Sequence, residues 1–155
     1  MEDYSLDALD RRILSALQQH HDASIAELGQ IVGLSQTPCW RRMKRLQDSG
    51  VIQRRAWILD PLRLGLSVNV FAEVRLKQHD EDTLEAFETM TSGCSEIVEC
   101  FSMSGQSDYL LRIVVRNVAD YEVLLKKVLL HLPGVGSINS SFALKAIKIE
   151  TNLPI

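Results

Sequence analysis

Apolar residues in the first fifty positions recur every three or four residues, which is the spacing of helices that each bury one face. A first helix is predicted over residues 7–20, where Asp7 suits the N-cap and Asp10 lies favourably in the first turn. Its buried face is predicted to consist of Leu9, Ile13, Leu14 and Leu17. We expect this helix to pack behind the two that follow it and to complete a three-helix core.

The next two helices have clear start and stop signals. An S-x-x-E capping box at Ser24 opens one helix, and Gly33 ends it. Ser35 is the predicted N-cap of the following helix, Pro38 falls within its first turn, and Gly50 suits the left-handed residue after its end. The predicted apolar positions are Ala26, Leu28, Ile31 and Val32 in the first of these helices, and Cys39, Met43 and Leu46 in the second.

Two short helices joined by a three-residue turn that contains Gly form a helix-turn-helix. Gln36 and Thr37 lie at the N-terminal tip of its second helix, and Arg41, Lys44 and Arg45 lie away from the apolar stripe. A helix with a cationic face and a polar tip suits the DNA major groove, whereas a plain helical hairpin with a solvated basic face is the simpler alternative. Because Arg41 and Arg45 lie off the stripe, we expect the fold to survive their removal.

The segment Val51–Leu59 is rich in β-branched and aromatic residues, so a strand is predicted there. It could form the wing of a winged helix, with Arg54 or Arg55 near phosphate, or it could pair with another subunit. Asp60-Pro61 ends this segment and begins a linker. We therefore predict a DNA-binding domain at 1–61, a linker at 62–66 and a second domain at 67–155.

From Leu66 onward, strands of period two alternate with helices. The predicted strands are 68–76, 97–103, 108–116 and 137–149, and the predicted helices are 82–91 and 118–132. The inward positions of these helices are predicted to be Leu84, Phe87 and Met90, then Tyr121, Leu124, Leu125, Val128 and Leu129. The order β-α-β-β-α-β is that of a ferredoxin-like fold, so the whole chain is predicted to be α+β, a winged helix-turn-helix domain followed by a ferredoxin-like βαββαβ domain.

A ferredoxin-like sheet has helices on one face only, so its other face, which carries Phe71, would be left open. Open apolar faces of this kind mark partner surfaces. We expect self-association through the sheets, with a dimer as the minimum unit, because DNA readers of this type favour two-fold dimers.

The net charge of −3 argues against DNA binding until it is divided along the chain. The window from Gln36 to Trp57 contains six basic residues against Asp48 alone, whereas Gln78–Cys100 contains seven acids and no Lys or Arg. DNA responds to the local field, so the acidic part should face away from it. Three cysteines without metal-type spacing, an acidic N-terminus and no membrane-length apolar run predict a reduced, cytoplasmic protein with no metal and no membrane partner.

The chain resembles the Lrp/AsnC, or feast/famine, family of bacterial and archaeal regulators. The resemblance rests on LDALDRRILSALQ (6–18), AELGQIVGLSQTPCWRRMKRLQDSGVI (26–52), SGQSDYLLRIVV (104–115) and LPGVGSINSSFALKAIK (132–148). It implies a cytosolic transcriptional regulator on the nucleoid whose second domain forms dimers, then tetramers or octamers, and binds an amino-acid effector between dimers. No other cofactor is implied.

Two sets of site residues are predicted. In the DNA-binding set, the resemblance implies Ser35, Thr37, Pro38, Arg41, Arg42 and Arg45, and the polar tip, the cationic face and the predicted wing add Gln36, Lys44 and Arg54. The effector-binding set is the turn Gly105, Gln106, Ser107 and Asp108, with Ser140 and Ser141. In the turn, Gly105 permits a tight backbone and Asp108 offers a carboxylate to an ammonium group. Gln36 and Trp40 depart from the family's usual residues, and we favour core packing for Trp40 over a role in base preference.

Three other classes of function compete with this one. RNA binding by the βαββαβ unit is disfavoured, because no strand carries the paired aromatic pattern that stacks bases. An enzyme site built from Cys100, Asp108 and His131 is disfavoured, because the chain lacks a phosphate-binding glycine loop, H-E-x-x-H and C-x-x-C. A ligand-independent architectural DNA-binding protein stays open, because an effector pocket assembled between chains leaves little trace in one sequence.

Overall fold

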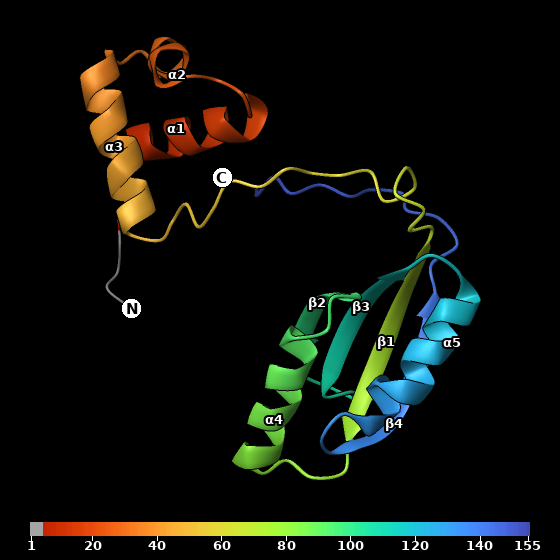
Figure 1. Ribbon diagram of the computed structural model, residues 1–155. Helices are drawn as coiled ribbons and strands as arrows, with labels where there is room; N and C mark the ends of the chain where they lie inside the picture. The colour runs from red at the N-terminus through yellow and green to blue at the C-terminus, as the bar shows by residue number, and fades with distance from the viewer. Residues whose placement is uncertain (1–4) are drawn as a thin grey trace. The chain divides into compact units, whose positions relative to one another are not determined.

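The computed structural model describes residues 5–155, which form two compact units (Figure 1). The first unit runs to Trp57 and also includes the C-terminal tail Ile149–Ile155, and the second unit is Ile58–Lys148. These limits differ from the predicted domains, because the division falls before the predicted linker and the tail groups with the first unit. Within the described residues, no helix has both the length and the apolar character needed to cross a membrane.

The first unit contains the three predicted helices, α1 (Ala8–Gln19), α2 (Ile25–Val32) and α3 (Gln36–Asp48). Both capping boxes are formed, at Asp7 with Asp10 before α1 and at Ser24 with Glu27 before α2. Gly50 has φ of 76°, the left-handed conformation predicted for it, and Gly33, which ends α2 as predicted, is also left-handed with φ of 72°. Ser35 has the extended backbone of an N-cap, but its hydroxyl makes no capping hydrogen bond, so that detail of the prediction is wrong.

The core of this unit joins all three helices. Its fully buried apolar residues are Ile13, Ala16, Leu28, Val32, Cys39 and Leu46. The predicted inward positions Ala26 and Ile31 are exposed, because the buried side of the eight-residue α2 is the one that carries Leu28, Gly29 and Val32.

No strand forms at Val51–Leu59 within the single chain. Its apolar side chains are largely exposed, with Trp57 at 89% and Ile58 at 76%. The composition is that of a strand, but the segment pairs with no other strand in the described chain. Pairing with a second subunit stays a prediction.

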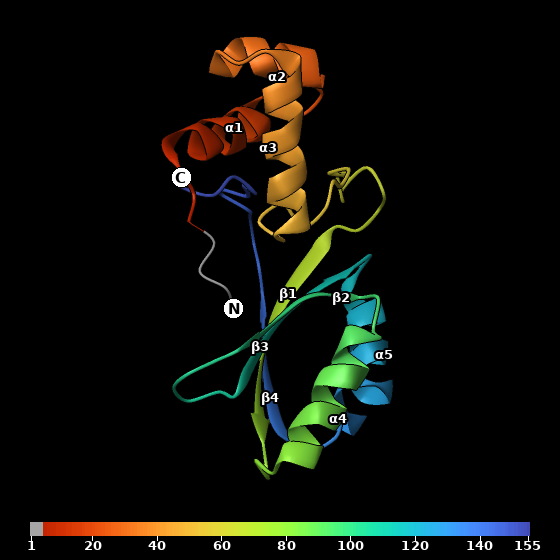
Figure 2. The ribbon, with the colours of Figure 1, turned by 90° about the vertical axis from the view of Figure 1, so that its left-hand side faces the viewer.

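The second unit is the predicted ferredoxin-like arrangement. Its elements are β1 (Val68–Leu76), α4 (Glu81–Ser92), β2 (Ile97–Ser102), β3 (Tyr109–Val115), α5 (Val118–Lys127) and β4 (Val135–Phe142). The sheet has the order β2-β3-β1-β4, and every neighbouring pair is antiparallel. Both helices cover the same face of the sheet (Figure 2).

Alternate residues of β1 and β3 form the core under these helices, as the period-two pattern predicted. In α4, Phe87 is buried as expected, but Met90 is 49% exposed and the neighbouring Thr91 is buried instead. The buried residue at this end of α4 is therefore one position later than predicted.

Two predicted elements end early. The helix from Val118 stops at Lys127, and Leu129–His131 continues as a short 3₁₀ turn in which Leu129 remains buried. Strand β4 ends at Phe142 rather than residue 149, because its partner β1 begins at Val68 and offers little to pair with beyond that point. The chain then continues to the tail, where the Gln18 side chain bonds both the N–H and the carbonyl of Leu153.

Candidate DNA interface and effector turn

The N-terminal tip of α3 is open to solvent. Ser35, Gln36, Thr37 and Pro38 are all exposed, and so are Arg41 and Lys44 farther along the helix. The opposite side of α3 is buried through Cys39 and Leu46. The structure thus brings most of the predicted DNA-binding set onto the outer surface of one helix.

Trp40 is not part of the core, so the expected core packing is wrong. Its side chain is 50% exposed, and the Lys44 ammonium lies 5.5 Å from the centre of its ring. A cation at this distance over an indole makes a weak attractive contact that holds both side chains on the outer face of α3.

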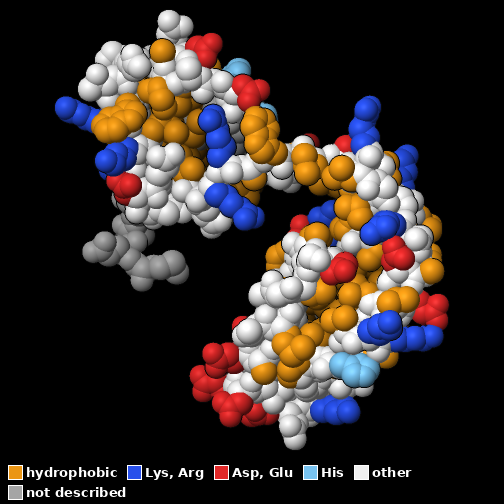
Figure 3. Space-filling model, viewed as in Figure 1, with side chains coloured by type: hydrophobic (Ala, Val, Ile, Leu, Met, Phe, Trp, Pro, Cys, Tyr) orange, Lys and Arg blue, Asp and Glu red, His pale blue; other side chains and the backbone are white. Residues whose placement is uncertain are grey.

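Acidic side chains gather at one end of the second unit, whereas Lys and Arg side chains lie on both units. Figure 3 shows Lys and Arg side chains on the first unit and a group of acids at one end of the second, over α4. The acids on or beside α4 include Asp80, which caps it, and Glu81 and Asp82 in its first turn. The local charge pattern predicted from the sequence is therefore present at the surface.

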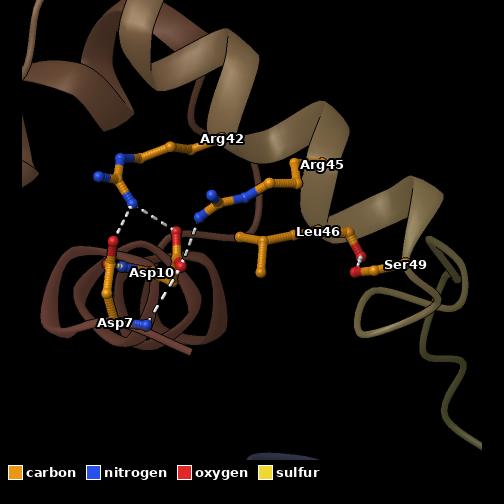
Figure 4. Close-up of polar contacts among 6 residues, drawn as sticks. All are labelled: Asp7, Asp10, Arg42, Arg45, Leu46 and Ser49. Carbon is orange, nitrogen blue, oxygen red and sulfur yellow. Dashed lines mark hydrogen bonds and ion pairs between the residues drawn. The ribbon is translucent and has the colours of Figure 1, made fainter. Parts of the chain in front are cut away.

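Two of the predicted DNA-binding arginines are engaged in ion pairs with α1 (Figure 4). Arg42 contacts Asp7 at 2.6 Å and Asp10 at 2.8 Å, and Arg45 contacts the other oxygen of Asp10 at 2.7 Å. The hydrogen bond from Arg42 lowers the pKa of Asp7, and the same pairing raises the pKa of Arg42. Asp7 and Arg42 are therefore charged at neutral pH.

This network links Arg45 to α1, a contact that the sequence did not indicate. The Asp10 side chain is fully buried, so removing Arg45 would leave its carboxylate with one ion-pair partner fewer. Sequence reasoning placed Asp10 only in the helix cap. Its burial depends on how α1 crosses α3, thirty-five residues along the chain.

Gly29 is a second residue whose role was missed. It is buried inside α2, and a Cβ there would lie 2.7 Å from the Leu34 carbonyl oxygen. The Leu34 N–H also bonds the Gly29 carbonyl at 2.8 Å. The turn before α3 therefore lies against the backbone of α2, which requires a residue without a side chain.

The segment after α3 carries the remaining predicted contact, Arg54. This residue is exposed in irregular chain, whereas the neighbouring Arg55 donates to the His21 carbonyl at 3.1 Å. Both arginines are exposed to solvent.

The predicted effector turn joins β2 to β3. Gly105 has φ of 128°, a conformation that other residues rarely adopt. The Asp108 carboxylate accepts the Leu76 N–H at 2.7 Å and contacts His79 Nε2 at 2.8 Å. The hydrogen bond from the Leu76 N–H lowers the pKa of Asp108 the most, and the contact with His79 lowers it further. Asp108 is therefore an ionised carboxylate that is fixed in place and already has two donors.

A second contact fixes the same turn. The Arg75 guanidinium donates to the Gln106 carbonyl from Nε at 2.9 Å and from its terminal nitrogen at 2.5 Å. Arg75 and Leu76 are neighbours at the end of β1, so this strand holds both ends of the turn. Sequence reasoning missed Arg75 and His79, since nothing in their spacing relates them to the turn.

The structure does not bring Ser140 and Ser141 to this turn within one chain. Ser140 faces the helices and bonds the Tyr121 hydroxyl, whereas Ser141 pairs with Phe71 on the open face. Phe71 lies five residues before Leu76 on β1, a separation of about 17 Å at roughly 3.3 Å per residue. A contact from these serines to an effector at the turn would have to come from another chain.

Comparison with known proteins identifies the family. Residues 6–53 match the family described as winged helix-turn-helix DNA-binding, and residues 69–153 match the Lrp/AsnC ligand binding domain. The leucine-responsive regulatory protein of Escherichia coli (strain K12) is 39% identical over 150 residues, covering 97% of this chain and 92% of that protein.

Solved structures agree over almost the whole length. An AsnC family transcriptional regulator from Agrobacterium tumefaciens is 40% identical with a TM-score of 0.90, covering 96% of this chain and 97% of that one. A regulator from Neisseria meningitidis, solved in complex with L-methionine, is 34% identical with a TM-score of 0.91 and covers 97% of each chain. The relatives named here are transcriptional regulators and not enzymes. This chain therefore belongs to the Lrp/AsnC family of DNA-binding transcriptional regulators.

Proposed function

We propose that this regulator binds two-fold DNA sites through α3, and that an amino acid bound at the Gly105–Asp108 turn changes its assembly and its DNA affinity. Binding at a contact between dimers would change the free energy of assembly, and linkage would carry that change to DNA. Acting on chromosomal DNA, the protein would work in the cytosol.

The exposure of α3 supports the DNA part. Gln36 and Thr37 lie at its tip, where recognition helices contact base edges, and Arg41 lies on the same outer surface. The unused Ser35 hydroxyl and the adjoining N–H groups are suited to a phosphate. Arg54 adds a cation beyond the helix. We propose half-sites spaced about one helical turn apart, roughly 34 Å.

The single observation that carries the effector part is the state of Asp108. It is ionised, 26% exposed and fixed by β1, so it can accept an ammonium group without reorganising. An ionised carboxylate has about four lone-pair positions, of which two are used here. Backbone N–H groups near Gly105 are our proposed donors to the effector carboxylate.

The identity of the effector is the first experiment. A thermal-shift screen of the twenty amino acids against the full chain would rank candidates, with L-methionine tested first because the Neisseria meningitidis regulator was solved with it. Leucine comes next, given the name of the Escherichia coli relative. If no amino acid raises the melting temperature, a ligand-independent architectural role replaces this proposal.

The role of Asp108 is tested by Asp108→Asn. The amide oxygen can still accept the Leu76 N–H while the charge is lost, whereas Asp108→Ala would also leave that N–H unpaired. We expect free-protein DNA affinity within about twofold of wild type and at least a tenfold weaker amino-acid response, since charged hydrogen bonds contribute roughly 1.5–3 kcal/mol. The measurement is a DNA-shift titration with and without the best amino acid.

Asp120→Asn is the matched control, because Asp120 is an exposed acid in the first turn of α5, outside the effector turn. It should respond to the amino acid like the wild type. An unaltered response in Asp108→Asn would place the effector site elsewhere.

A further inference from the structure

Asp10 is an unusual residue for a small helical unit. Its side chain is completely buried, yet it is a carboxylate. One oxygen accepts from Arg42, and the other accepts from both Arg45 and the Asp7 N–H. A buried charge is stable only when its partners are held in good geometry, so this carboxylate fixes the two arginines as well as being neutralised by them.

The two arginines differ in what they leave to solvent. The Arg42 side chain is 25% exposed and lies between two carboxylates, Asp7 and Asp10 (Figure 4). The Arg45 side chain is 51% exposed and is bound by Asp10 through its Nη2 atom. Arg42 is therefore mostly enclosed, whereas about half of the Arg45 side chain surface is exposed to solvent.

The position along the helix indicates what Arg45 contacts. It lies nine residues after Gln36, or about 13 Å along the axis at roughly 1.5 Å per residue. The start of a recognition helix enters the groove, and residues farther along it come near the sugar-phosphate backbone. A guanidinium is well suited to phosphate, and one already held by a carboxylate loses less side-chain entropy on binding.

We propose that Asp10 is the positioning residue of the DNA interface: it presents Arg45 to a DNA phosphate and uses Arg42 as a structural brace between α1 and α3. The family resemblance assigned both arginines to DNA, and the geometry divides them. The inference rests on the proposal that α3 contacts DNA.

The test uses glutamine substitutions of the full-length protein and the DNA sequence that in-vitro selection with the wild type yields. Each phosphate contact contributes about one to the slope of log affinity against log salt concentration. Arg45→Gln is expected to weaken binding at least fivefold and to reduce that slope by about one. Arg42→Gln should lower the melting temperature and leave the slope unchanged at temperatures where it is folded.

Asp10→Asn tests the positioning step, with Asp7→Asn as the matched control that removes the same charge but no contact to Arg45. Losing a negative charge near DNA should by itself strengthen binding. We expect the opposite for Asp10→Asn, which should bind DNA at least fivefold more weakly, with a reduced slope of log affinity against log salt concentration. Asp7→Asn should bind DNA as well as the wild type or better. Stronger binding by folded Asp10→Asn would overturn the proposal.

If Asp10→Asn fails to fold, Arg45→Gln still tests the proposal. A wild-type dependence of DNA affinity on salt concentration in Arg45→Gln would contradict the proposal. Arg41→Gln tests the underlying assignment of α3 separately. If Arg41→Gln binds normally, α3 is not the contact helix and the proposed function fails. If only Arg41→Gln weakens binding, α3 stands and the role of Asp10 is wrong.

Discussion

Tyr109 begins β3 with its hydroxyl turned into the helix-covered side of the sheet. It donates to Glu88 at 2.8 Å, and its ring packs against Phe87 with the two centres 4.5 Å apart. Burial raises the pKa of Tyr109 to about 12, and the hydrogen bond to Glu88 acts in the same direction. The residue next to the proposed effector contact is therefore held neutral by its surroundings.

This environment predicts an alkaline limit to stability. The folded-state pKa lies above the unfolded value near 10, so the associated stability is complete below pH 10 and is lost as the pH rises toward 12. The free energy of unfolding should fall by about 2–3 kcal/mol over that range from this group. Ultraviolet difference absorbance of tyrosinate measures the titration directly.

Glu88→Gln serves as the comparison for Tyr109. It removes the charge that opposes ionisation, so tyrosinate should appear at lower pH than in the wild type. A Tyr109 that ionises near pH 10 in the folded wild type would contradict the buried position described here.

At the scale of elements, the arrangement of α2 and α3 depends on how closely the turn between them packs against the backbone of α2. The helix-turn-helix is compact because Gly29 lets the Leu34 carbonyl lie against α2. The left-handed Gly33 then turns the chain, and α3 starts three residues later. The orientation of α3, and with it the DNA interface, depends on this contact.

Gly29→Ala is therefore expected to destabilise the first unit. Its Cβ would lie 2.7 Å from a backbone oxygen, which cannot move as a side chain could. Overpacking costs roughly 1–3 kcal/mol, and the better helix propensity of Ala recovers only about 1 kcal/mol. Urea unfolding followed by tryptophan fluorescence is specific for this unit, because both tryptophans of the chain, Trp40 and Trp57, belong to it.

Gly93→Ala at the end of α4 is the control substitution, and because it lies in the second unit its unfolding is followed by circular dichroism instead of tryptophan fluorescence. Its φ is −84°, and the nearest atom to a Cβ there is 3.6 Å away, an ordinary contact. It should change stability by less than about 0.5 kcal/mol. Equal stability of Gly29→Ala and the wild type would show that the turn can relax.

At the scale of the whole molecule, the face of the sheet that no helix covers is the proposed surface for assembly. The exposed Phe71 and Phe101 lie on the face opposite the helices, beside Leu110 and Val114. Arg112 bonds Glu99 and Asn69 among them, so the face is apolar with a paired polar centre. Such a face suits a second copy of the same chain, whose matching polar groups would meet around a two-fold axis.

We predict a dimer as the smallest species and a tetramer or octamer at higher concentration. Phe71→Glu should give a monomer at micromolar concentration, because it places an unpaired charge in the proposed contact. Val123→Glu on the exposed side of α5 is the control and should leave the mass unchanged. Light scattering distinguishes these states, and a monomeric wild type would rule out sheet-mediated assembly.

Local patterns determined most of the elements. The helix caps at Asp7 and Ser24, the left-handed Gly50 and the period-two strands were readable from the sequence because each depends on residues close to one another along the chain. The ferredoxin-like order followed from the order of those elements. The capping, the turn and the charges predicted the DNA-binding helix, whereas family resemblance supplied the Gly105–Asp108 turn as an effector site, which local patterns alone would have left as a plain turn.

Tertiary structure decided which polar groups meet. Asp10 with Arg45, and Asp108 with Leu76 and His79, are about thirty residues apart in sequence and are brought together only by the packing of their elements. The same packing exposed Trp40 and turned Ser140 toward Tyr121. The sequence could identify these side chains as charged or polar, but their partners depend on crossing angles and strand register, which no spacing along the chain encodes.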